Sequence, residues 1–192
     1  MIMETIQFVD LLYPKMEQRR DVQILDISER NLTGHLNLEG FDNLTYLDCG
    51  YNQIESIDTS KLKNLTYLDC SNNKLERLDT SPLSKLKVLA ISSNQIEFLD
   101  TESLSNLTYL NVQENKLIAL ITNNLKNLAC LNVSNDPIEY LETKNLSELV
   151  YLSAFLCGLK SLDVSPLINL NYLYCPFNQI PMLEIKNLPK LA

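Results

Sequence analysis

The chain has 192 residues, of which 45% are hydrophobic and 21% charged, a composition typical of a folded domain with a sizeable core. No stretch reaches the roughly 18 apolar residues of a membrane helix, and the first residues lack the features of a signal peptide, so we expect neither. The net charge of −8, with Lys15, Arg19 and Arg20 as the largest basic cluster, argues against nucleic acid as a partner.

Residues 1–21 are predicted to form an N-terminal helical cap. Apolar residues recur there at roughly helical spacing, and Pro14 interrupts the pattern near its middle. These residues are Ile6, Phe8, Val9, Leu11, Leu12 and Met16. An apolar helical segment before a repeat array covers the exposed end of the first repeat.

Residues 22–192 contain an internal repeat. Seven units of 21 residues begin at Leu44, Leu65, Leu86, Leu107, Leu128, Leu149 and Leu170. Positions one, four, fourteen and nineteen are aliphatic in every unit, and an earlier unit at 22–43 keeps the pattern with one extra residue. One unit cannot bury its own apolar side, so the repeat predicts coils stacked around a shared core, eight in number plus the start of a ninth.

Each unit is predicted to contribute one short parallel strand. Positions four and six, Leu47 and Cys49 in the first regular unit, are apolar and alternate with positions three, five and seven. The return segment, as in residues 80–83, mixes a capping threonine, a proline and a leucine, which favours a short extended or 3₁₀ segment. Positions three, five and seven therefore form the exposed face of a sheet.

This pattern, with leucine at positions one and four, asparagine at nine and an LDTS-type return segment, resembles the leucine-rich repeat family. The resemblance runs from Val22 to the end of the chain, and the 21-residue length is similar to repeats of bacterial and some symbiotic fungal proteins. It implies an α/β solenoid, a leucine-rich repeat horseshoe with a concave parallel β-sheet. It also implies protein binding through that sheet, and it carries over no active site.

Position nine forms the asparagine ladder by which the family satisfies backbone groups where the chain leaves the strand. Its members are Asn52, Asn73, Asn94, Asn115, Asp136, Cys157 and Asn178. Asp136, followed by Pro137, lacks the amide donors, so we predict a local irregularity over residues 135–138.

The five cysteines are predicted to be free thiols. Cys49 and Cys70 fall on adjacent strands with parallel side chains, which separates their Cβ atoms more than a disulfide prefers. Cys130 is the one cysteine expected on the exposed face. His35 is the single histidine and no CxxC pair occurs, so we expect no metal site, cofactor or catalytic residue and favour a reducing compartment. Six Asn-x-Ser/Thr triplets occur, most of them by-products of the junctions between units, and we favour this interpretation over a glycosylated secreted protein.

The exposed face is predicted to become aromatic toward the C-terminus, where a patch of several hundred Å² could anchor a partner. The candidate partner-binding residues are Tyr109, Tyr151, Phe155, Leu156, Tyr172, Tyr174 and Phe177. Two other interpretations stay open: stacked tyrosines pack on one another within a sheet, and a following segment or a second copy of the chain covers the patch.

A secondary acidic surface is predicted at the other end of the same face. Asp26, Asp48 and Asp69 occupy position five of the first units, with about 4.8 Å between neighbouring strands. Adjacent like charges gain from a positive partner, so a basic peptide or a cation could bind there. The alternative is a solvated ladder with no ligand.

The hypothesis from sequence is a non-catalytic module that binds a protein or peptide, with no nucleic acid or membrane partner, in the cytoplasm or delivered into a host cell. The alternative is a recognition arm of a larger enzyme or receptor, such as a kinase, ligase or effector. A stand-alone enzyme is disfavoured because His35 offers no catalytic constellation. Leu191 would open a ninth unit without a polar closing segment, which predicts either a fragment of a longer protein or end-to-end self-association through Leu183, Leu188 and Leu191.

Overall fold

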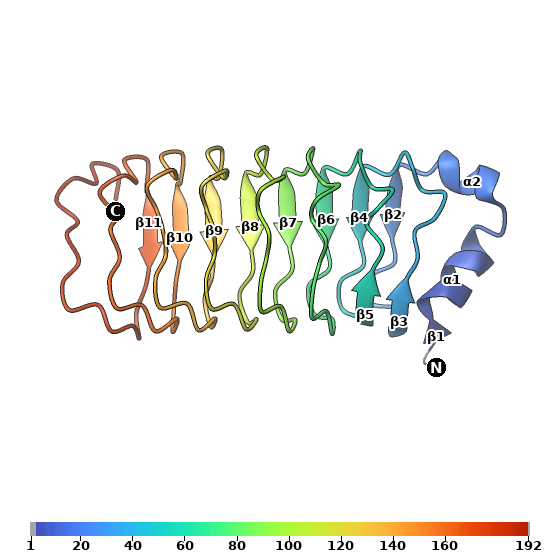
Figure 1. The fold of residues 1–192 in the computed structure, drawn as a ribbon, viewed down its shortest axis with the longest axis horizontal. Helices are drawn as coiled ribbons and strands as arrows, with labels where there is room; N and C mark the ends of the chain where they lie inside the picture. The colour runs from blue at the N-terminus through green and yellow to red at the C-terminus, as the bar shows by residue number, and fades with distance from the viewer. Residues whose placement is uncertain (1–2, 192) are drawn as a thin grey trace.

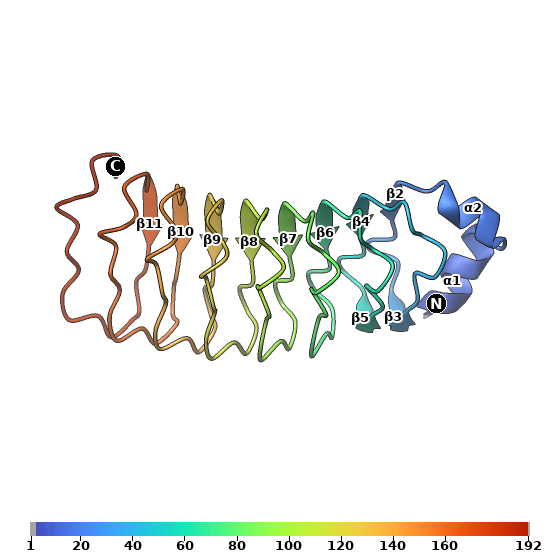
Figure 2. The same ribbon diagram turned by 45° about the horizontal axis from the view of Figure 1, so that its top comes forward.

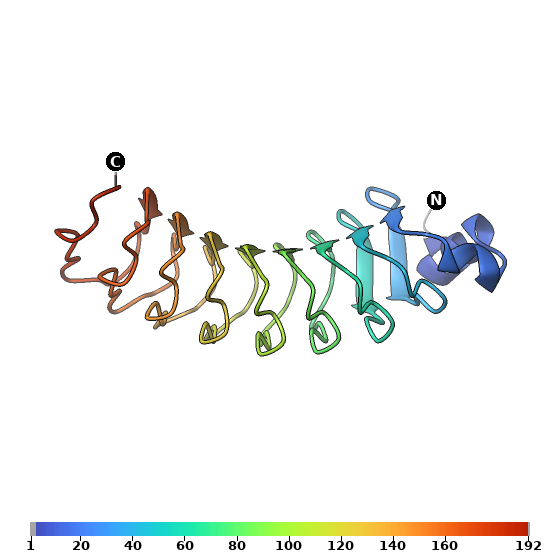
Figure 3. The ribbon, with the colours of Figure 1, turned by 90° about the horizontal axis from the view of Figure 1, so that it is seen from above.

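The computed structural model describes residues 3–191, which form a curved solenoid with parallel strands side by side along one face (Figure 1). Eight strands make this sheet, in the order β11-β10-β9-β8-β7-β6-β4-β2. Their bounds are β2 (Ile24–Asp26), β4 (Tyr46–Asp48), β6 (Tyr67–Asp69), β7 (Val88–Ala90), β8 (Tyr109–Asn111), β9 (Cys130–Asn132), β10 (Tyr151–Ser153) and β11 (Tyr172–Tyr174). The sheet follows the inner side of the arc (Figure 3). The predicted fold class and strand positions are confirmed.

The core is a set of stacked leucine columns behind the sheet. Leu47 pairs with Leu68, and Leu68 with Leu89, in neighbouring strands, and all three side chains are fully buried. Burying one leucine contributes about 1.5 to 3 kcal/mol, so each column stabilises the whole stack. This confirms that the repeat specifies one shared interior.

The return segments run along the outer side of the arc (Figures 2 and 3). In the first regular unit, consecutive tight turns are closed when the Leu62 amide donates to the Thr59 carbonyl at 2.9 Å and the Leu65 amide to the Leu62 carbonyl at 3.0 Å. These i to i+3 bonds close tight turns, and the return segment is short, as predicted. The Thr59 hydroxyl also donates to the Asp79 carbonyl of the next unit at 2.7 Å, and Thr80, Thr101, Thr122 and Thr143 repeat this contact.

The asparagine ladder lies where the chain leaves each strand of the main sheet. The side-chain oxygen of Asn94 accepts a hydrogen bond from the Leu75 amide at 2.9 Å. Its nitrogen donates to the carbonyls of Cys70 at 3.0 Å and Ile91 at 3.1 Å. One buried amide therefore satisfies backbone groups of two successive units, which confirms its structural role.

A local irregularity lies within residues 135–138, as predicted, but its cause is Cys157 and not the carboxyl group of Asp136. The Ile138 amide donates to the Asp136 carbonyl at 2.8 Å, a local bond that the other ladder turns do not make. In the next unit, the Leu159 amide bonds the side-chain oxygen of Asn178 at 3.0 Å. For the Ile138 amide, the corresponding oxygen would come from residue 157, which is a cysteine. A thiol has no oxygen to accept this hydrogen bond, so the Ile138 amide bonds the nearby Asp136 carbonyl instead.

The N-terminal end holds two helices, α1 (Thr5–Leu12) and α2 (Met16–Arg20), stacked on the first turns (Figure 1). Val9 of α1 is buried, and the Tyr13 ring meets Phe41 edge-on with 5.5 Å between ring centroids. Met1 and Ile2, part of the predicted cap, lie outside the described residues. Within residues 3–191, no helix has the length and apolar character needed to cross a membrane.

A second, three-stranded parallel sheet was not predicted. It has the order β1-β3-β5 and consists of β1 (Met3–Glu4), β3 (Leu32–Leu36) and β5 (Gln53–Ile57). The pairing of β3 with β5 shifts register between Gly34 and His35, where β5 has one more residue, Glu55, than β3. Because β1 pairs with β3, this sheet joins the cap to the return side of the first two turns.

At the C-terminal end the covering of the core is thinner. Leu173 of β11 is only partly buried, as are Leu183 and Leu191, whereas Leu188 is buried. The predicted end-to-end association through this region stays a prediction, and Ala192 lies outside the described residues.

Candidate partner-binding surface

Six of the seven predicted binding residues form one cluster on β10, β11 and the turns that follow them. They are Tyr151, Phe155, Leu156, Tyr172, Tyr174 and Phe177, and this set is called the aromatic surface below. Tyr151 and Tyr172 stack with 4.7 Å between ring centroids and an interplanar angle of 1°. Phe155 stacks on Tyr174 at 5.8 Å and meets Phe177 edge-on at 5.4 Å. The stacked register of the strands therefore merges these side chains into one layer.

Tyr109, the seventh predicted residue, lies apart from this cluster. It is on β8, and Cys130 of β9 stands between it and Tyr151 in the same column. A cysteine side chain is too small to bridge the two tyrosine rings, so Tyr109 is not continuous with the aromatic surface.

Much of the aromatic surface is open to solvent. The exposed fractions of Leu156, Tyr172, Tyr174 and Phe177 are 54%, 47%, 43% and 72%. A single exposed apolar residue is ordinary, but adjacent exposed ones form an apolar patch of the kind that marks interaction sites. Covering the patch would remove substantial apolar area from water.

Leu156 and Phe177 also adopt an unusual backbone conformation. Their φ angles are +53° and +57°, in the left-handed region, where a side chain of this bulk crowds the backbone. Position eight has this conformation in every turn, at Glu29, Tyr51, Asn72, Ser93, Glu114, Asn135, Leu156 and Phe177. Asn72 and Asn135 suit it, because asparagine tolerates this region best among residues with a Cβ atom. The last turns thus accept backbone strain at two residues whose apolar side chains face water.

A shallow hollow of about 340 Å³ lies beside the stacked rings. It is lined by Gln113, Asn132, Ser134, Tyr151, Ser153, Phe155, Tyr172 and Tyr174. The Ser134 hydroxyl lies 2.8 Å from that of Ser153 and accepts a hydrogen bond from the Phe155 amide at 3.1 Å. The four polar residues were not predicted as site residues, although Asn132, Ser134 and Ser153 stand at positions five and seven, which the repeat assigns to the exposed face.

The predicted acidic residues lie in register on neighbouring strands, with Asp48 between Asp26 and Asp69. Burial raises the pKa of Asp48 most, and the negative charges of Asp69 and Asp26 raise it further, whereas a hydrogen bond from the Gly50 amide opposes them. Hydrogen bonds from the hydroxyl and amide of Ser28 lower the pKa of Asp26.

Each of these carboxylates also has a structural task. Asp48 accepts from the Gly50 amide at 3.0 Å and Asp69 from the Ser71 amide at 2.8 Å, two residues further along in both cases. Asn132 makes the same contact with Ser134 at 3.1 Å. Such side-chain turns end a strand in the same way whether the residue is Asp or Asn. The geometry therefore favours a structural origin of the acidic row, and ligand binding there stays a prediction.

All five cysteines are free, as predicted. Burial raises the pKa of Cys49 and Cys70 well above the ordinary thiol value, and the carboxylates of Asp48 and Asp69 add to this for both thiols. Cys130 and Cys175 are only partly buried.

We expect a thiol reagent to modify Cys130 and Cys175 in the native protein and to reach Cys49 and Cys70 only on unfolding, because the reagent attacks an accessible thiolate. Mass spectrometry over a time course at pH 8 would identify the sites. The variant Cys130→Ser/Cys175→Ser serves as the control and should react slowly until denatured. Equal modification of all five cysteines in the native protein would contradict the burial of Cys49 and Cys70.

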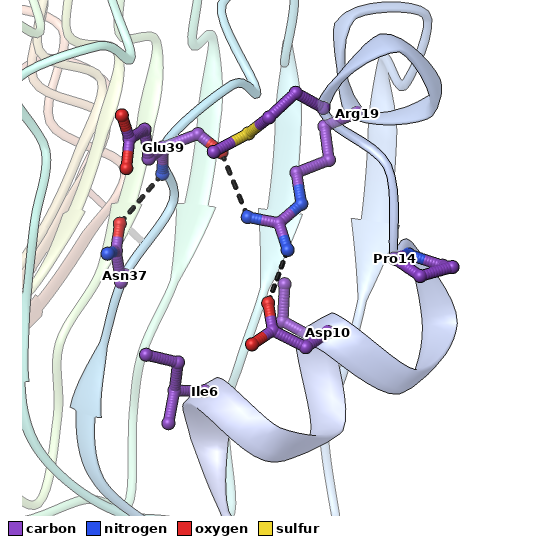
Figure 4. A pocket seen from close by; sticks show the side chains of 8 residues that line it. Ile6, Asp10, Pro14, Arg19, Asn37 and Glu39 are labelled. Atoms are coloured by element: carbon purple, nitrogen blue, oxygen red, sulfur yellow. Dashed lines mark hydrogen bonds and ion pairs between the residues drawn. The ribbon is translucent and has the colours of Figure 1, made fainter.

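A second hollow, of about 440 Å³, lies between α1, α2 and the first return segment (Figure 4). Arg19 crosses it and is almost fully buried. Its guanidinium donates to the Tyr13 carbonyl at 3.0 Å and to the Glu39 carbonyl at 3.3 Å, and it pairs with Asp10. The donors of Arg19 are thus used to fix the helices to the solenoid, so we assign this hollow a structural role.

Within residues 3–191, no three His, Cys, Asp or Glu side chains are placed to hold a metal ion. His35 lies on β3, and its Nδ1 is 2.8 Å from the Ser56 hydroxyl.

The fold and surface define a class: a repeat solenoid with an open concave sheet. Residues 42–85 match the family model described as leucine rich repeats (2 copies). The same turn geometry continues on both sides of that match, and solved leucine-rich repeat proteins share it. The chain has the fold of leucine-rich repeat proteins, and its repeats of about 21 residues are similar to theirs. No curated protein matches the sequence.

Solved structures of this class superpose on the chain. Internalin C2 from Listeria monocytogenes is 27% identical with a TM-score of 0.74, and the match covers 92% of this chain and 81% of that one. The functional domain of InlJ from the same bacterium, which includes a cysteine ladder, is 24% identical with a TM-score of 0.65 over 92% of this chain and 49% of its own. TLR13 in a complex with ssRNA13 is 24% identical with a TM-score of 0.75 over 100% of this chain and 30% of its own.

These likenesses show the fold. The chain spans about half the length of the InlJ domain. Leucine-rich repeat domains are typically non-catalytic protein-interaction modules, and no enzyme family is indicated for this chain.

Proposed function

We propose that the chain binds a protein partner through the aromatic surface. The observation that carries the proposal is that Leu156 and Phe177, bulky, exposed and held at positive φ, follow the two strands that bear the stacked rings, and that Phe177 contacts Phe155. Nothing in the stack requires them, because Asn72 and Asn135 occupy the same position in other turns without exposing apolar area. Strain kept together with exposed apolar side chains is characteristic of a surface that is completed by binding.

The energetics suit a binding hot spot. Aromatic residues supply most of the free energy of association at the centre of an interface, and each large apolar side chain contributes about 1.5 to 3 kcal/mol when buried. The stacked pairs are already ordered, so binding loses little side-chain entropy.

The free thiols of Cys49 and Cys70 support function in a reducing compartment, the cytoplasm or a host cell into which the protein is delivered. A second candidate function is that of a recognition arm within a larger enzyme or receptor. It is favoured by the chain spanning only 49% of the InlJ domain and 30% of TLR13. In that role the aromatic surface would bind the same kind of partner.

The test uses the variant Leu156→Asn/Phe177→Asn. We expect partner affinity to fall by at least tenfold, while the free energy of unfolding stays unchanged or rises by up to about 1 kcal/mol, because asparagine relieves the left-handed strain. Loss of the Phe177 contact with Phe155 offsets part of that gain. Capture from native extract identifies the partner, isothermal calorimetry gives its affinity, and urea denaturation gives stability.

The matched control is Tyr51→Asn. Tyr51 is 63% exposed with a φ of +53° but lies in the N-terminal half, so this variant should gain similar stability and bind normally. Equal affinity for the wild type and the Leu156/Phe177 variant would overturn the proposed surface. Because TLR13 forms a complex with single-stranded RNA, such an RNA is also tested as a ligand. If the wild type binds the RNA and the Leu156/Phe177 variant does not, the partner is a nucleic acid and not a protein.

A further inference from the structure

Asp136 is the one residue of the buried ladder that carries a carboxyl group. It is 1% exposed, and its Oδ1 accepts a hydrogen bond from the Leu117 amide at 2.9 Å. Its Oδ2 has no hydrogen-bond partner, and no other buried side-chain nitrogen or oxygen within residues 3–191 shares that condition. A buried oxygen without a partner is costly and calls for an explanation.

The neighbouring turn shows what this position requires. In Asn115 the oxygen accepts from the Ile96 amide at 3.0 Å, while the nitrogen donates to the carbonyls of Ile91 at 2.9 Å and Val112 at 2.7 Å. Oδ1 of Asp136 has the role of the amide oxygen, so Oδ2 occupies the place of the amide nitrogen. An ionised carboxylate there would turn a negative oxygen toward carbonyl oxygens, whereas a protonated one offers them a donor.

The charged groups around Asp136 do little to stabilise its ionised form. The titratable group packed against it is the Cys157 thiol of the following turn, which donates to the Val133 carbonyl at 3.1 Å. The charged residues on the flanking turns are Glu114, Lys116, Glu139 and Lys160, which are exposed to solvent. Burial raises the pKa of Asp136 to about 7, and hydrogen bonds from the Leu117 and Asn115 amides limit the rise.

We propose that Asp136 is protonated in the folded chain, donates from Oδ2 to a ladder carbonyl as an asparagine would, and loosens this turn when it loses the proton. The solenoid thereby contains one proton-sensitive step in an otherwise pH-independent ladder. Loosening of this turn also affects the aromatic surface, because the Asn135 amide donates to the Phe155 carbonyl at 2.8 Å. It goes beyond partner binding, since it acts on the free protein.

The sign of the pH effect follows from linkage. The unfolded chain ionises Asp136 near the ordinary value of 3.8, while the folded chain retains the proton to about 7. Between these values the unfolded state binds fewer protons, so the stability supplied by Asp136 falls as pH rises. This contribution is fully present below the unfolded value and lost above the folded one.

The test compares the wild type with Asp136→Asn by urea denaturation between pH 4.5 and 8.5, without any partner. Relative to the variant, the folding equilibrium constant of the wild type should fall by up to tenfold per pH unit up to about pH 7 and level off above it. Asp163→Asn is the control. Hydrogen bonds from Ser165 lower the pKa of Asp163, so the stability of the wild type relative to this variant should not fall as pH rises. A pH-independent difference for Asp136→Asn would overturn the proposal.

Two further readouts localise the effect. Carbon-detected NMR should show one aspartate carboxyl titrating near pH 7 that is missing in Asp136→Asn. Hydrogen exchange at Leu117, Asn135 and Phe155 should be faster in the wild type than in the variant at pH 8 and equal at pH 5. A carboxyl of Asp136 that titrates near its ordinary value contradicts the retained proton, whatever the outcome of the binding experiments.

Discussion

Replacing Phe155 and Tyr174 by alanine together is expected to weaken partner binding by at least 100-fold. The two rings stack at 5.8 Å in the middle of the aromatic surface, where truncation of a hot-spot side chain costs about 2 kcal/mol or more. Two such losses, which are not fully additive, reach at least about 3 kcal/mol, and 1.4 kcal/mol corresponds to a factor of ten. Calorimetric titration of the captured partner against both proteins measures the change.

The fold should survive this double substitution. Tyr174 is 43% exposed, and loss of a stacked pair costs about 0.5 to 1.5 kcal/mol beyond the area it buries, which leaves most of the stability of the stack in place. A matched control is Tyr46→Ala/Tyr67→Ala, because these rings stack at 4.3 Å at the other end of the same sheet. If the Phe155/Tyr174 variant unfolds, or if both variants bind equally poorly, the aromatic surface is a structural element and not a binding site.

The substitution Leu110→Ala is expected to lower the free energy of unfolding by about 3 kcal/mol. Leu110 is fully buried on β8, with Leu89 and Leu131 paired to it on either side. Removing the side chain loses transfer free energy and leaves a cavity that the regular stack cannot close, and such leucine deletions cost about 2 to 5 kcal/mol. Urea denaturation followed by circular dichroism gives the value.

The position of Leu110 makes the result informative about the stack. Each turn contacts only its neighbours, so a defect in a central turn should also broaden the transition as the two halves begin to unfold separately. Ile118→Ala is the comparison, since Ile118 is 73% exposed and its truncation should change stability by less than about 0.5 kcal/mol. Equal effects of the two substitutions would contradict a continuous core behind the sheet.

The candidate surface was predicted in part. The columns at positions three and five placed Tyr151, Tyr172 and Tyr174 on one face, because residues 21 apart align in register on parallel strands. The separation of Tyr109 by Cys130 follows from the same columns. The left-handed backbone at Leu156 and Phe177 was not predicted, since it depends on how the turn after each strand closes against its neighbours.

The chain's repeat determined the solenoid, the strands, the buried leucine columns and the residue types on the concave face, because side chains at a fixed spacing must stack once the turns do. Only the tertiary structure decided the second sheet at β3 and β5, which pairs an irregular unit with its neighbour, and the partnerless oxygen of Asp136. Those features depend on contacts between consecutive turns. A periodic pattern specifies which residues meet, but hydrogen-bond geometry decides whether each polar atom finds a partner.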